Sequence, residues 1–355
     1  MLLAAVLFSG WTAIQTNACT GITLEAEDGS RIMARTVEWA ATPMHTGYVV
    51  APRAHFHQSY TPSGQDGLVY RSRYGYVGVY TEYEPFVVEG INETGLSVGL
   101  FFFPQYGSYK EYKPSRKSQS LCDMQFVSWA LSQFSTIEQL KQALSKIDLV
   151  SLDHRLGSVH WRIAEPGGRI VVLEYKDGVP VFYENPLGVL TNAPEFPWHI
   201  THLNQYVNLY TGSASSHDLT EGVTLNPLGG GSGMIGLPGD FTPPSRFVRA
   251  AFVQSSAPVQ ANGWQSVKQA FHLLNLFDLP VGMQHKKGQV PKDMPSATQF
   301  TVVSDLKSAK LYYKTMWNSE IRCIELKSID FGEVSFQSHP LDDEKEQAVK
   351  IITIR

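Results

Sequence analysis

The residue of greatest chemical interest is Cys19, which directly follows the triplet TNA in the stretch TNACTGITLEAEDGSRIMARTVEWA (residues 16–40). If the chain is cut before Cys19, this residue carries a thiol and a free α-amine on the same carbon atom. An α-amine has an ordinary pKa of about 8, so a useful fraction is neutral at pH 7 and can accept the thiol proton. The pattern predicts nucleophilic catalysis in which one residue supplies both nucleophile and base, without a histidine.

Two charged residues follow Cys19 after a short stretch of chain. The segments TGITLEA and IMARTVEW flank the turn sequence EDGS, so we expect a hairpin that returns Arg35 and Glu38 to the neighbourhood of Cys19. A guanidinium group beside the sulfur favours the thiolate. In the same register Glu38 could accept a hydrogen bond from the α-ammonium group.

Residues 1–18, MLLAAVLFSGWTAIQTNA, have the apolar core and small residues of a secretory signal peptide, although the first basic residue is only Arg31. The apolar run is shorter than the ~20 residues that span a membrane. We therefore predict an exported protein without a stable membrane anchor, located in the bacterial periplasm. Two alternatives remain, a buried N-terminal strand or helix and a lipid-modified Cys19, although Thr16 and Asn17 fit a lipoprotein signal poorly.

The composition excludes several classes of protein. The chain of 355 residues has a net charge of −4 and no run of Lys or Arg, so we do not expect it to bind nucleic acid. No repeat, low-complexity tract or linker divides it, and we predict a single domain over residues 19–355. The three cysteines are too few for a disulfide scaffold, and Cys122 and Cys323 are interpreted as small buried side chains.

The pattern of elements favours an α+β fold with antiparallel sheets covered by helices. Strand patterns lie near both ends, in TGITLEA, RIMARTVEW, GYVVAPR, TQFTVVSD, AKLYYKTMW and IRCIELKS, and in the middle in HWRIAE, RIVVLEY and VPVFYE. Helices are predicted over 119–134, 137–147, 245–254 and 264–277, the second of them opened by a capping box of Thr136 and Gln139.

Two other patterns are interpreted as structural. The spacing of Gly231, Gly233 and Gly236 matches a dinucleotide fingerprint, but no buried strand precedes it and no helix can follow, so a glycine-rich surface loop is favoured. His55 and His57 could share a strand face, but no third ligand accompanies them, so solvated strand histidines are favoured. We predict neither a metal nor a cofactor.

Four blocks in order carry a family resemblance. The start, CTGITLEAEDGSRIMARTVEW, is followed by VVEGINETGLSVGLFFFP, GVLTNAPEFPWH and GLPGDFTPPSRFVRAAF. Together they resemble the choloylglycine hydrolase family, which holds bile salt hydrolases and penicillin V acylases within the N-terminal-nucleophile hydrolases. The resemblance covers nearly all of residues 19–355 and implies an αββα four-layer sandwich, with antiparallel sheets between helix layers.

The resemblance also implies roles for individual residues. Cys19 attacks an amide carbonyl with its own amine as base, and Asn192 donates to the oxyanion together with a backbone N–H at Phe102. Arg35 and Arg246 keep the surroundings of the sulfur positive and ordered. Without the resemblance, Asn192 is interpreted as a turn residue and Arg246 as the start of a helix.

Two departures from the family pattern concern the site. Glu38 stands where the family usually has an aspartate, and Phe102 stands where bile salt hydrolases tend to carry Asn and penicillin V acylases Tyr. The usual marker of substrate is therefore absent.

The segment FFFPQY suggests an apolar substrate wall made of Phe101, Phe103 and Tyr106. We favour conjugated bile salts as the small-molecule amide substrate, ahead of penicillin V or other N-acyl amides. The segment 210–240 matches the family's assembly loop in length and implies a homotetramer. A different class of function stays open, namely an exported binding protein that keeps the fold without chemistry.

Overall fold

The computed structural model describes residues 18–153 and 157–354. The predicted leader therefore lies outside the described residues, apart from Ala18.

The first sheet holds the predicted nucleophile near one edge. It is antiparallel and five-stranded, in the order β1-β2-β16-β17-β18. Its strands are β1 (Ala18–Glu25), β2 (Arg31–Glu38), β16 (Thr298–Asp305), β17 (Lys310–Thr315) and β18 (Arg322–Glu325). The outer edge of β1 is covered, because Gly21 and Leu190 form an antiparallel bridge through both backbone hydrogen bonds.

The second sheet is antiparallel and eight-stranded, in the order β13-β12-β11-β8-β7-β6-β3-β19. Its strands are β3 (Thr46–Ala51), β6 (Tyr76–Thr81), β7 (Val87–Asn92), β8 (Ser97–Phe102), β11 (Val159–Ala164), β12 (Ile170–Lys176), β13 (Val179–Glu184) and β19 (Gln337–Pro340). Strands β7 and β8 face β1, β16 and β17 of the first sheet.

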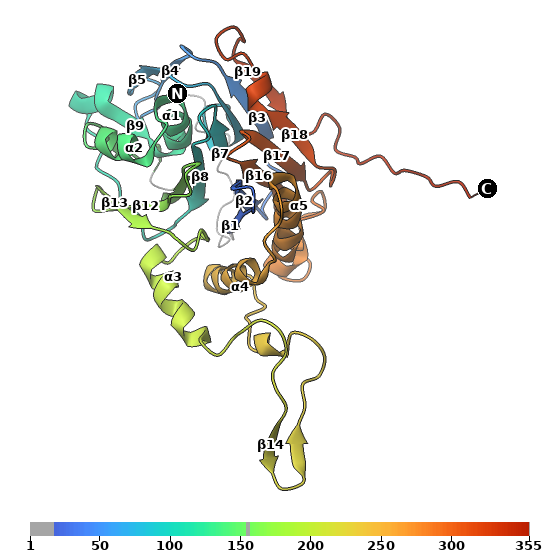
Figure 1. Ribbon diagram of the computed structural model, residues 1–355. Coiled ribbons are helices and arrows are strands. Elements are labelled where there is room, and N and C mark those ends of the chain that lie inside the picture. Colours follow the sequence, from blue (N-terminus) through green and yellow to red (C-terminus); the bar gives the residue numbers. More distant parts are fainter. Residues whose placement is uncertain (1–17, 154–156, 355) are drawn as a thin grey trace.

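Helices cover the outer faces of both sheets (Figure 1). Helices α4 (Pro243–Ser256) and α5 (Gly263–Leu274) pack on β1, β2 and β16, and α1 (Phe126–Gln133) packs on β7 and β8. Helix α2 (Ile137–Leu144) follows α1, and the short α3 (Phe196–His202) leads towards α4. The layers are helix, sheet, sheet and helix, which confirms the α+β fold and the four-layer sandwich.

The remaining short elements connect these layers. They are the strand pairs β4 (Phe56–Gln58) with β5 (Val69–Arg71), β9 (Ser120–Cys122) with β10 (Asp148–Val150), and β14 (His217–Thr220) with β15 (Val223–Leu225), and the 3₁₀ helices η1 (Pro114–Gln119), η2 (Asp123–Gln125), η4 (Leu203–Tyr206), η5 (Ser232–Met234), η6 (Asn275–Phe277), η7 (Val281–Gln284) and η8 (Leu326–Ser328). The β14–β15 hairpin projects away from the body (Figure 1).

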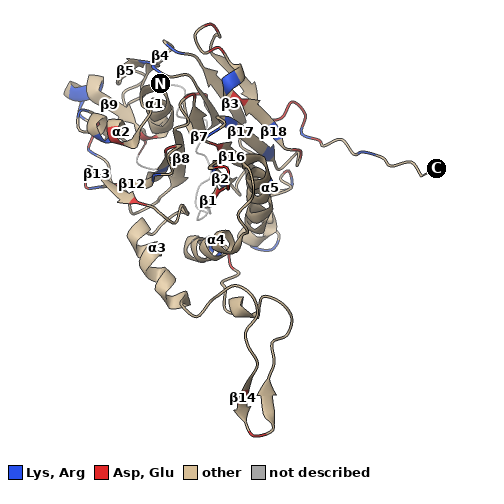
Figure 2. Ribbon diagram, viewed as in Figure 1, with Lys and Arg blue, Asp and Glu red and all other residues tan. Residues whose placement is uncertain are grey.

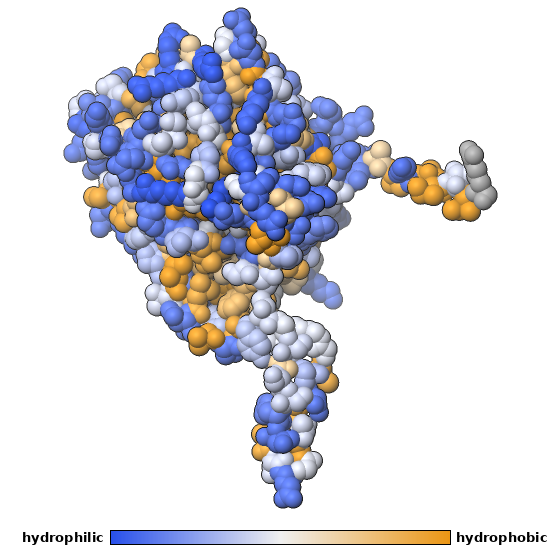
Figure 3. All heavy atoms as spheres, in the orientation of Figure 1, coloured by the Kyte–Doolittle hydropathy of each residue, from blue (hydrophilic) through white to orange (hydrophobic). Residues whose placement is uncertain are grey.

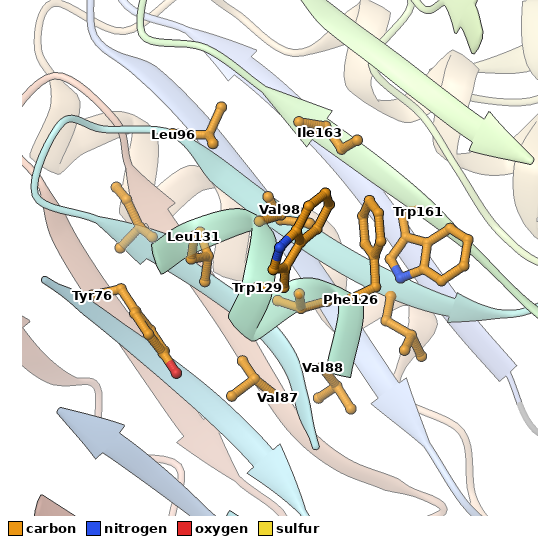
Figure 4. Packing of buried hydrophobic residues seen from close by; sticks show 14 of the residues in the cluster. Tyr76, Val87, Val88, Leu96, Val98, Phe126, Trp129, Leu131, Trp161 and Ile163 are labelled. Atoms are coloured by element: carbon orange, nitrogen blue, oxygen red, sulfur yellow. The ribbon is translucent and has the colours of Figure 1, made fainter. Parts of the chain in front are cut away.

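Strands β1, β2 and β16 of the first sheet are buried on both faces along most of their length, so their side chains alternate between two cores. Met33 and Val37 of β2 join the core that also contains the eight-stranded sheet, whereas Ile32 and Ala34 join the core under α4 and α5. Figure 4 shows aromatic residues of the core that contains the eight-stranded sheet, where the ring centroids of Phe126 and Trp161 are 4.5 Å apart. Continuous burial explains why apolar residues alternate with few polar ones along β2.

The predicted helices agree with the structure except at their boundaries. The Thr136 hydroxyl accepts from Gln139 N as the capping box predicts, but α2 ends at Leu144 rather than 147. The predicted helix 119–134 is wrong in its first part, because residues 120–122 pair with β10 as strand β9 and helix α1 begins only at Phe126. Pairing with β10 satisfies backbone groups that a helix would otherwise satisfy.

Gly21 offers a test of how closely the two sheets approach. A Cβ at this position would lie 2.7 Å from Arg162 Nη1 and 2.9 Å from Phe101 Cζ, both in the facing sheet. We expect Gly21→Ala to lower the free energy of unfolding by about 1–3 kcal/mol, since buried neighbours must shift. Urea unfolding measures this.

Gly167→Ala is the matched control, because a Cβ there meets nothing within 4 Å. It should change the free energy of unfolding by less than about 0.5 kcal/mol. Equal effects of the two substitutions would contradict the close packing at Gly21.

Candidate active site

The β1–β2 hairpin brings the predicted residues together in the expected way. Cys19 pairs with Val37, Gly21 with Arg35, and Ala18 with Glu38. Because side chains alternate along a strand, Cys19 and Arg35 share the face that meets the eight-stranded sheet, while Glu38 lies on the face covered by α4. The two charged residues therefore approach Cys19 from opposite sides of the sheet.

Asn192 lies at the backbone nitrogen of Cys19. Its Oδ1 accepts from Cys19 N at 3.0 Å, and its Nδ2 donates to the carbonyl oxygen of Phe102 at 2.8 Å. The loop that carries Asn192 follows β13 and is fixed to β1 by the bridge between Leu190 and Gly21. An amide nitrogen has two hydrogens, so one N–H of Asn192 remains for another acceptor.

Arg246 reaches the same point from the first turns of α4. Its Nη2 donates to Asn192 Oδ1 at 2.7 Å, which fixes the orientation of the carboxamide, and its Nη1 donates to Cys19 O at 2.5 Å and Thr20 Oγ1 at 2.8 Å. Pro243 and Pro244 stand at the start of α4, where a missing N–H costs no helical hydrogen bond. Arg246 is fully buried.

Arg35 is fully buried between the sheets. Its Nη1 donates to the carbonyl oxygens of Val88 and Leu100 and lies 3.7 Å from Glu89 Oε2. Its guanidinium lies over the Phe101 ring, 4.1 Å from the centroid. The carbonyls that accept from the guanidinium and the aromatic face beside it stabilise this side chain in an apolar interior.

The thiol of Cys19 is buried, and burial raises its pKa above the ordinary value of 9.0 despite the opposing effects of Arg35, Arg246 and a hydrogen bond from the Phe102 backbone. The negative charge of Glu38 raises it further. The two guanidinium groups therefore do not make a resting thiolate by themselves, and a base must take the proton before the sulfur can attack.

Glu38 is a buried carboxyl, and burial raises its pKa from 4.5 to about 7, although Arg246 and Arg35 oppose the shift. The hydroxyl of Thr298 lies 3.5 Å from Glu38 Oε1. In the described chain Ala18 precedes Cys19, so the nitrogen of Cys19 is an amide. A cut between these residues would place an amine beside the strand position that pairs with Glu38.

The aromatic residues of FFFPQY differ in accessibility. Phe101 and Phe103 are fully buried, the first against Arg35 and the second stacked on His160 at 4.3 Å. The prediction that these two rings line a substrate surface is therefore wrong for the described structure, since they pack inside the protein. Tyr106 is 42% exposed, and its role as a substrate contact stays a prediction.

Two charged residues behind the site were not predicted from the sequence. Arg162 is fully buried, and it donates to the carbonyls of Ile22, Gly188 and Ala34. Glu89, also buried, faces Arg35. Both residues stand in the middle of an apolar strand pattern, and this pattern could have predicted them from the sequence. A charged residue is rarely buried without partners.

The structure also places His55 and His57, the two histidines considered as metal ligands. His57 Nε2 lies 2.8 Å from Ser72 Oγ, and His55 stacks on Phe336, so both imidazoles are packed rather than freely solvated. Among residues 18–153 and 157–354, no group of three or more metal-ligating side chains lies together. In the same part of the chain, no helix has the length and apolar character to cross a membrane.

The two facing antiparallel sheets, with a cysteine on the first strand and an asparagine and arginine at its nitrogen and carbonyl, define an N-terminal-nucleophile hydrolase fold. The family model for linear amide C–N hydrolases of the choloylglycine hydrolase family matches residues 19–345. The chain belongs to the choloylglycine hydrolase family, and it is a hydrolase of linear amide C–N bonds.

Similar proteins support the assignment. A bile salt hydrolase/transferase from Clostridium perfringens is 31% identical over 325 residues, which cover 89% of this chain and 95% of that protein. A penicillin V acylase from Pectobacterium atrosepticum is 24% identical over 331 residues, covering 88% and 81%. The crystal structure of a variant of conjugated bile acid hydrolase from Clostridium perfringens matches with a TM-score of 0.79 at 26% identity, covering 94% of this chain and 100% of that chain.

Glu38 predicts a pH dependence of stability in the chain that retains Ala18. Between pH 4.5 and about 7 the folded chain binds more protons than the unfolded chain, because the folded pKa is the higher one. The free energy of unfolding should therefore fall as the pH rises through this window, by up to about 3 kcal/mol. Urea unfolding at several values from pH 4 to pH 8 measures the effect.

Glu38→Gln removes the titrating group, so the free energy of unfolding should change little with pH between pH 4.5 and pH 7. To keep residue 18 attached, both chains carry Cys19→Ala. If the Gln chain lost as much stability between pH 4.5 and pH 7 as the Glu chain, the raised pKa of Glu38 would be wrong.

Proposed function

We propose that this chain is an N-terminal cysteine amidohydrolase that cleaves the amide bond of conjugated bile salts, releasing the bile acid and glycine or taurine. The observation that carries the proposal is the contact between Cys19 N and Asn192 Oδ1, with Arg246 bound to both residues. It supports a site in which the asparagine is fixed directly beside the atoms that a cut before Cys19 would free.

The proposed reaction moves one proton at each step. The α-amine of Cys19 takes the thiol proton, and the sulfur bonds to the amide carbonyl carbon. The free N–H of Asn192 and the N–H of Phe102 donate to the resulting oxyanion, and one such donor is worth ~3–4 kcal/mol of barrier in other hydrolases. The α-ammonium then protonates the leaving amine as the C–N bond breaks, which leaves a thioester.

Water completes the cycle. The α-amine takes a proton from the water as its oxygen attacks the thioester carbonyl, the C–S bond breaks, and the sulfur recovers the proton. The buried thiol with its raised pKa fits this sequence, because a group that is neutral at rest requires the adjacent base. Glu38 is proposed to accept a hydrogen bond from the α-ammonium form of that base.

The substrate class rests on the relatives, several of which are named for bile salts. Penicillin V is the alternative, because a relative named penicillin V acylase also matches most of the chain. Phe102 offers a backbone N–H but no polar side-chain contact, so it does not separate the two substrates.

Assembly and location are proposed with the function. Some apolar side chains close to the β14–β15 hairpin in sequence are exposed, including Val207 at 88% and Leu228 at 98%. Figure 3 shows further apolar surface on the part of the body that lies beside α3. Figure 2 shows few charged residues along α3 and this hairpin. A projecting hairpin with exposed apolar side chains next to it suits an interface between copies of the chain. We propose a homotetramer, exported to the bacterial periplasm after removal of residues 1–18.

Substitution of Cys19 tests the nucleophile. Cys19→Ala should abolish hydrolysis, and Cys19→Ser should leave only weak activity because an alkoxide is harder to form than a thiolate. Cys122→Ala is the matched control, since that thiol is buried in another part of the fold, beside Asp123. Turnover by the Cys19→Ala variant at the wild-type rate would refute the assignment.

Product analysis tests the substrate. Glycine or taurine release from conjugated bile salts, detected with ninhydrin, should exceed release of 6-aminopenicillanate from penicillin V. Equal or faster turnover of penicillin V would reverse the choice of substrate. Edman degradation of the active protein should begin at Cys19, and any other first residue would rule out the proposed base.

A further inference from the structure

Two buried histidines hold the backbone on either side of the Asn192 α-carbon. Nε2 of His160 on β11 lies 3.1 Å from the carbonyl oxygen of Thr191, and Nε2 of His199 on α3 lies 2.9 Å from the carbonyl oxygen of Asn192. A carbonyl oxygen only accepts hydrogen bonds, so each Nε2 carries a hydrogen. Both peptide planes that flank Asn192 are thus fixed, and with them the direction of its side chain.

Glu174 connects the two histidines. It lies opposite His160 on the neighbouring strand β12, with Oε1 3.4 Å from His160 Nδ1. The same oxygen accepts from the backbone N–H of Phe196 at 2.7 Å. Phe196 is the first residue of α3, so its N–H has no acceptor within the helix. One carboxyl group therefore orients the His160 ring and fixes the start of the helix that carries His199.

Packing leaves these side chains little freedom. His160, Glu174 and His199 are all fully buried. The His160 ring stacks on Phe103 with centroids 4.3 Å apart, and the His199 ring stacks on Phe247 at 4.6 Å. Burial lowers the pKa of His199 to about 4, so its ring is neutral at physiological pH and Nε2 remains the donor.

Both nitrogens of His160 face acceptors, whereas a neutral imidazole has one N–H. Nε2 of His160 faces the Thr191 carbonyl, and Nδ1 faces Glu174 Oε1. An apolar core would be simpler to build than this arrangement, because each buried polar group needs a partner. His160 and His199 each donate to one of the two carbonyls beside Asn192, and Glu174 contacts both His160 and the start of α3.

We propose that His160, Glu174 and His199 are positioning residues that hold Asn192 in the geometry for oxyanion stabilisation. The inference rests on the proposed function in one respect, namely that the free N–H of Asn192 donates in the transition state. Loss of a positioning residue should slow the chemical step and leave substrate binding nearly unchanged, because the oxyanion exists only in the transition state.

Paired substitutions of His199 test the proposal. His199→Phe keeps a ring on Phe247 and removes the donor, whereas the amide nitrogen of His199→Gln can replace Nε2. We expect His199→Phe to lower kcat by about 10- to 30-fold, because a small displacement of a catalytic group already costs much of its effect. KM should stay within about twofold, and His199→Gln should recover most of kcat.

A double-variant comparison separates positioning from a merely structural role. If His199 acts through Asn192, adding His199→Phe to Asn192→Ala should cost little beyond Asn192→Ala alone. His202→Phe is the control, because His202 lies on the same helix, stacks on Trp198 and meets the Tyr206 ring edge-on. It should retain the wild-type kcat. The pair His160→Phe and His160→Gln repeats the test from the sheet, should a His199 variant fail to fold.

The outcomes distinguish the positioning role from the mechanism on which it rests. An unchanged kcat in His199→Phe, or losses that multiply in the double variant, would overturn the positioning role while Asn192→Ala remained impaired. An unchanged kcat in Asn192→Ala would instead remove Asn192 from the proposed mechanism itself.

Discussion

The carboxamide of Asn192 joins parts of the chain that are far apart in sequence. Its oxygen accepts from the backbone nitrogen of Cys19 and from Arg246, and its nitrogen donates to the Phe102 carbonyl. Only a side chain with an acceptor of two lone pairs and a donor of two hydrogens can make these contacts and keep one N–H in reserve. Asn192 lies on the loop after β13, and its carboxamide contacts β1, the end of β8 and the start of α4.

Three buried arginines surround the site, and each needs hydrogen-bond acceptors that several strands and loops supply. Arg35, Arg162 and Arg246 are fully buried, and a buried cation is tolerated only when its donors are used. Backbone carbonyls of strands and loops meet this need, together with the carboxyl of Glu89 beside Arg35. Two sheets covered by helices exclude water from this region, and the same exclusion raises the pKa of both Cys19 and Glu38.

Much of the fold could be predicted from local patterns. The hairpin around EDGS, which returns Arg35 and Glu38 towards Cys19, followed from strand periodicity and a turn, and the start of α2 followed from Thr136 and Gln139. The predicted helix 119–134 was wrong where residues 120–122 pair with residues 148–150, because a distant segment supplied the hydrogen-bond partners. Phe101 and Phe103 were placed on a surface because an aromatic run does not reveal which side of a strand is covered.

The sequence by itself determined the nucleophile candidate, the hairpin that returns Arg35 and Glu38 to it, and the family through its four blocks. These features are local or lie in order along the chain, so no knowledge of packing is required to see them. Only the tertiary structure decided that Arg246 meets Cys19 and Asn192, that burial outweighs the nearby guanidinium groups at the thiol, and that His160, Glu174 and His199 converge on one loop. The physical reason is that these effects depend on distances and water exclusion between residues separated by tens to hundreds of positions, and strand or helix periodicity carries no record of either.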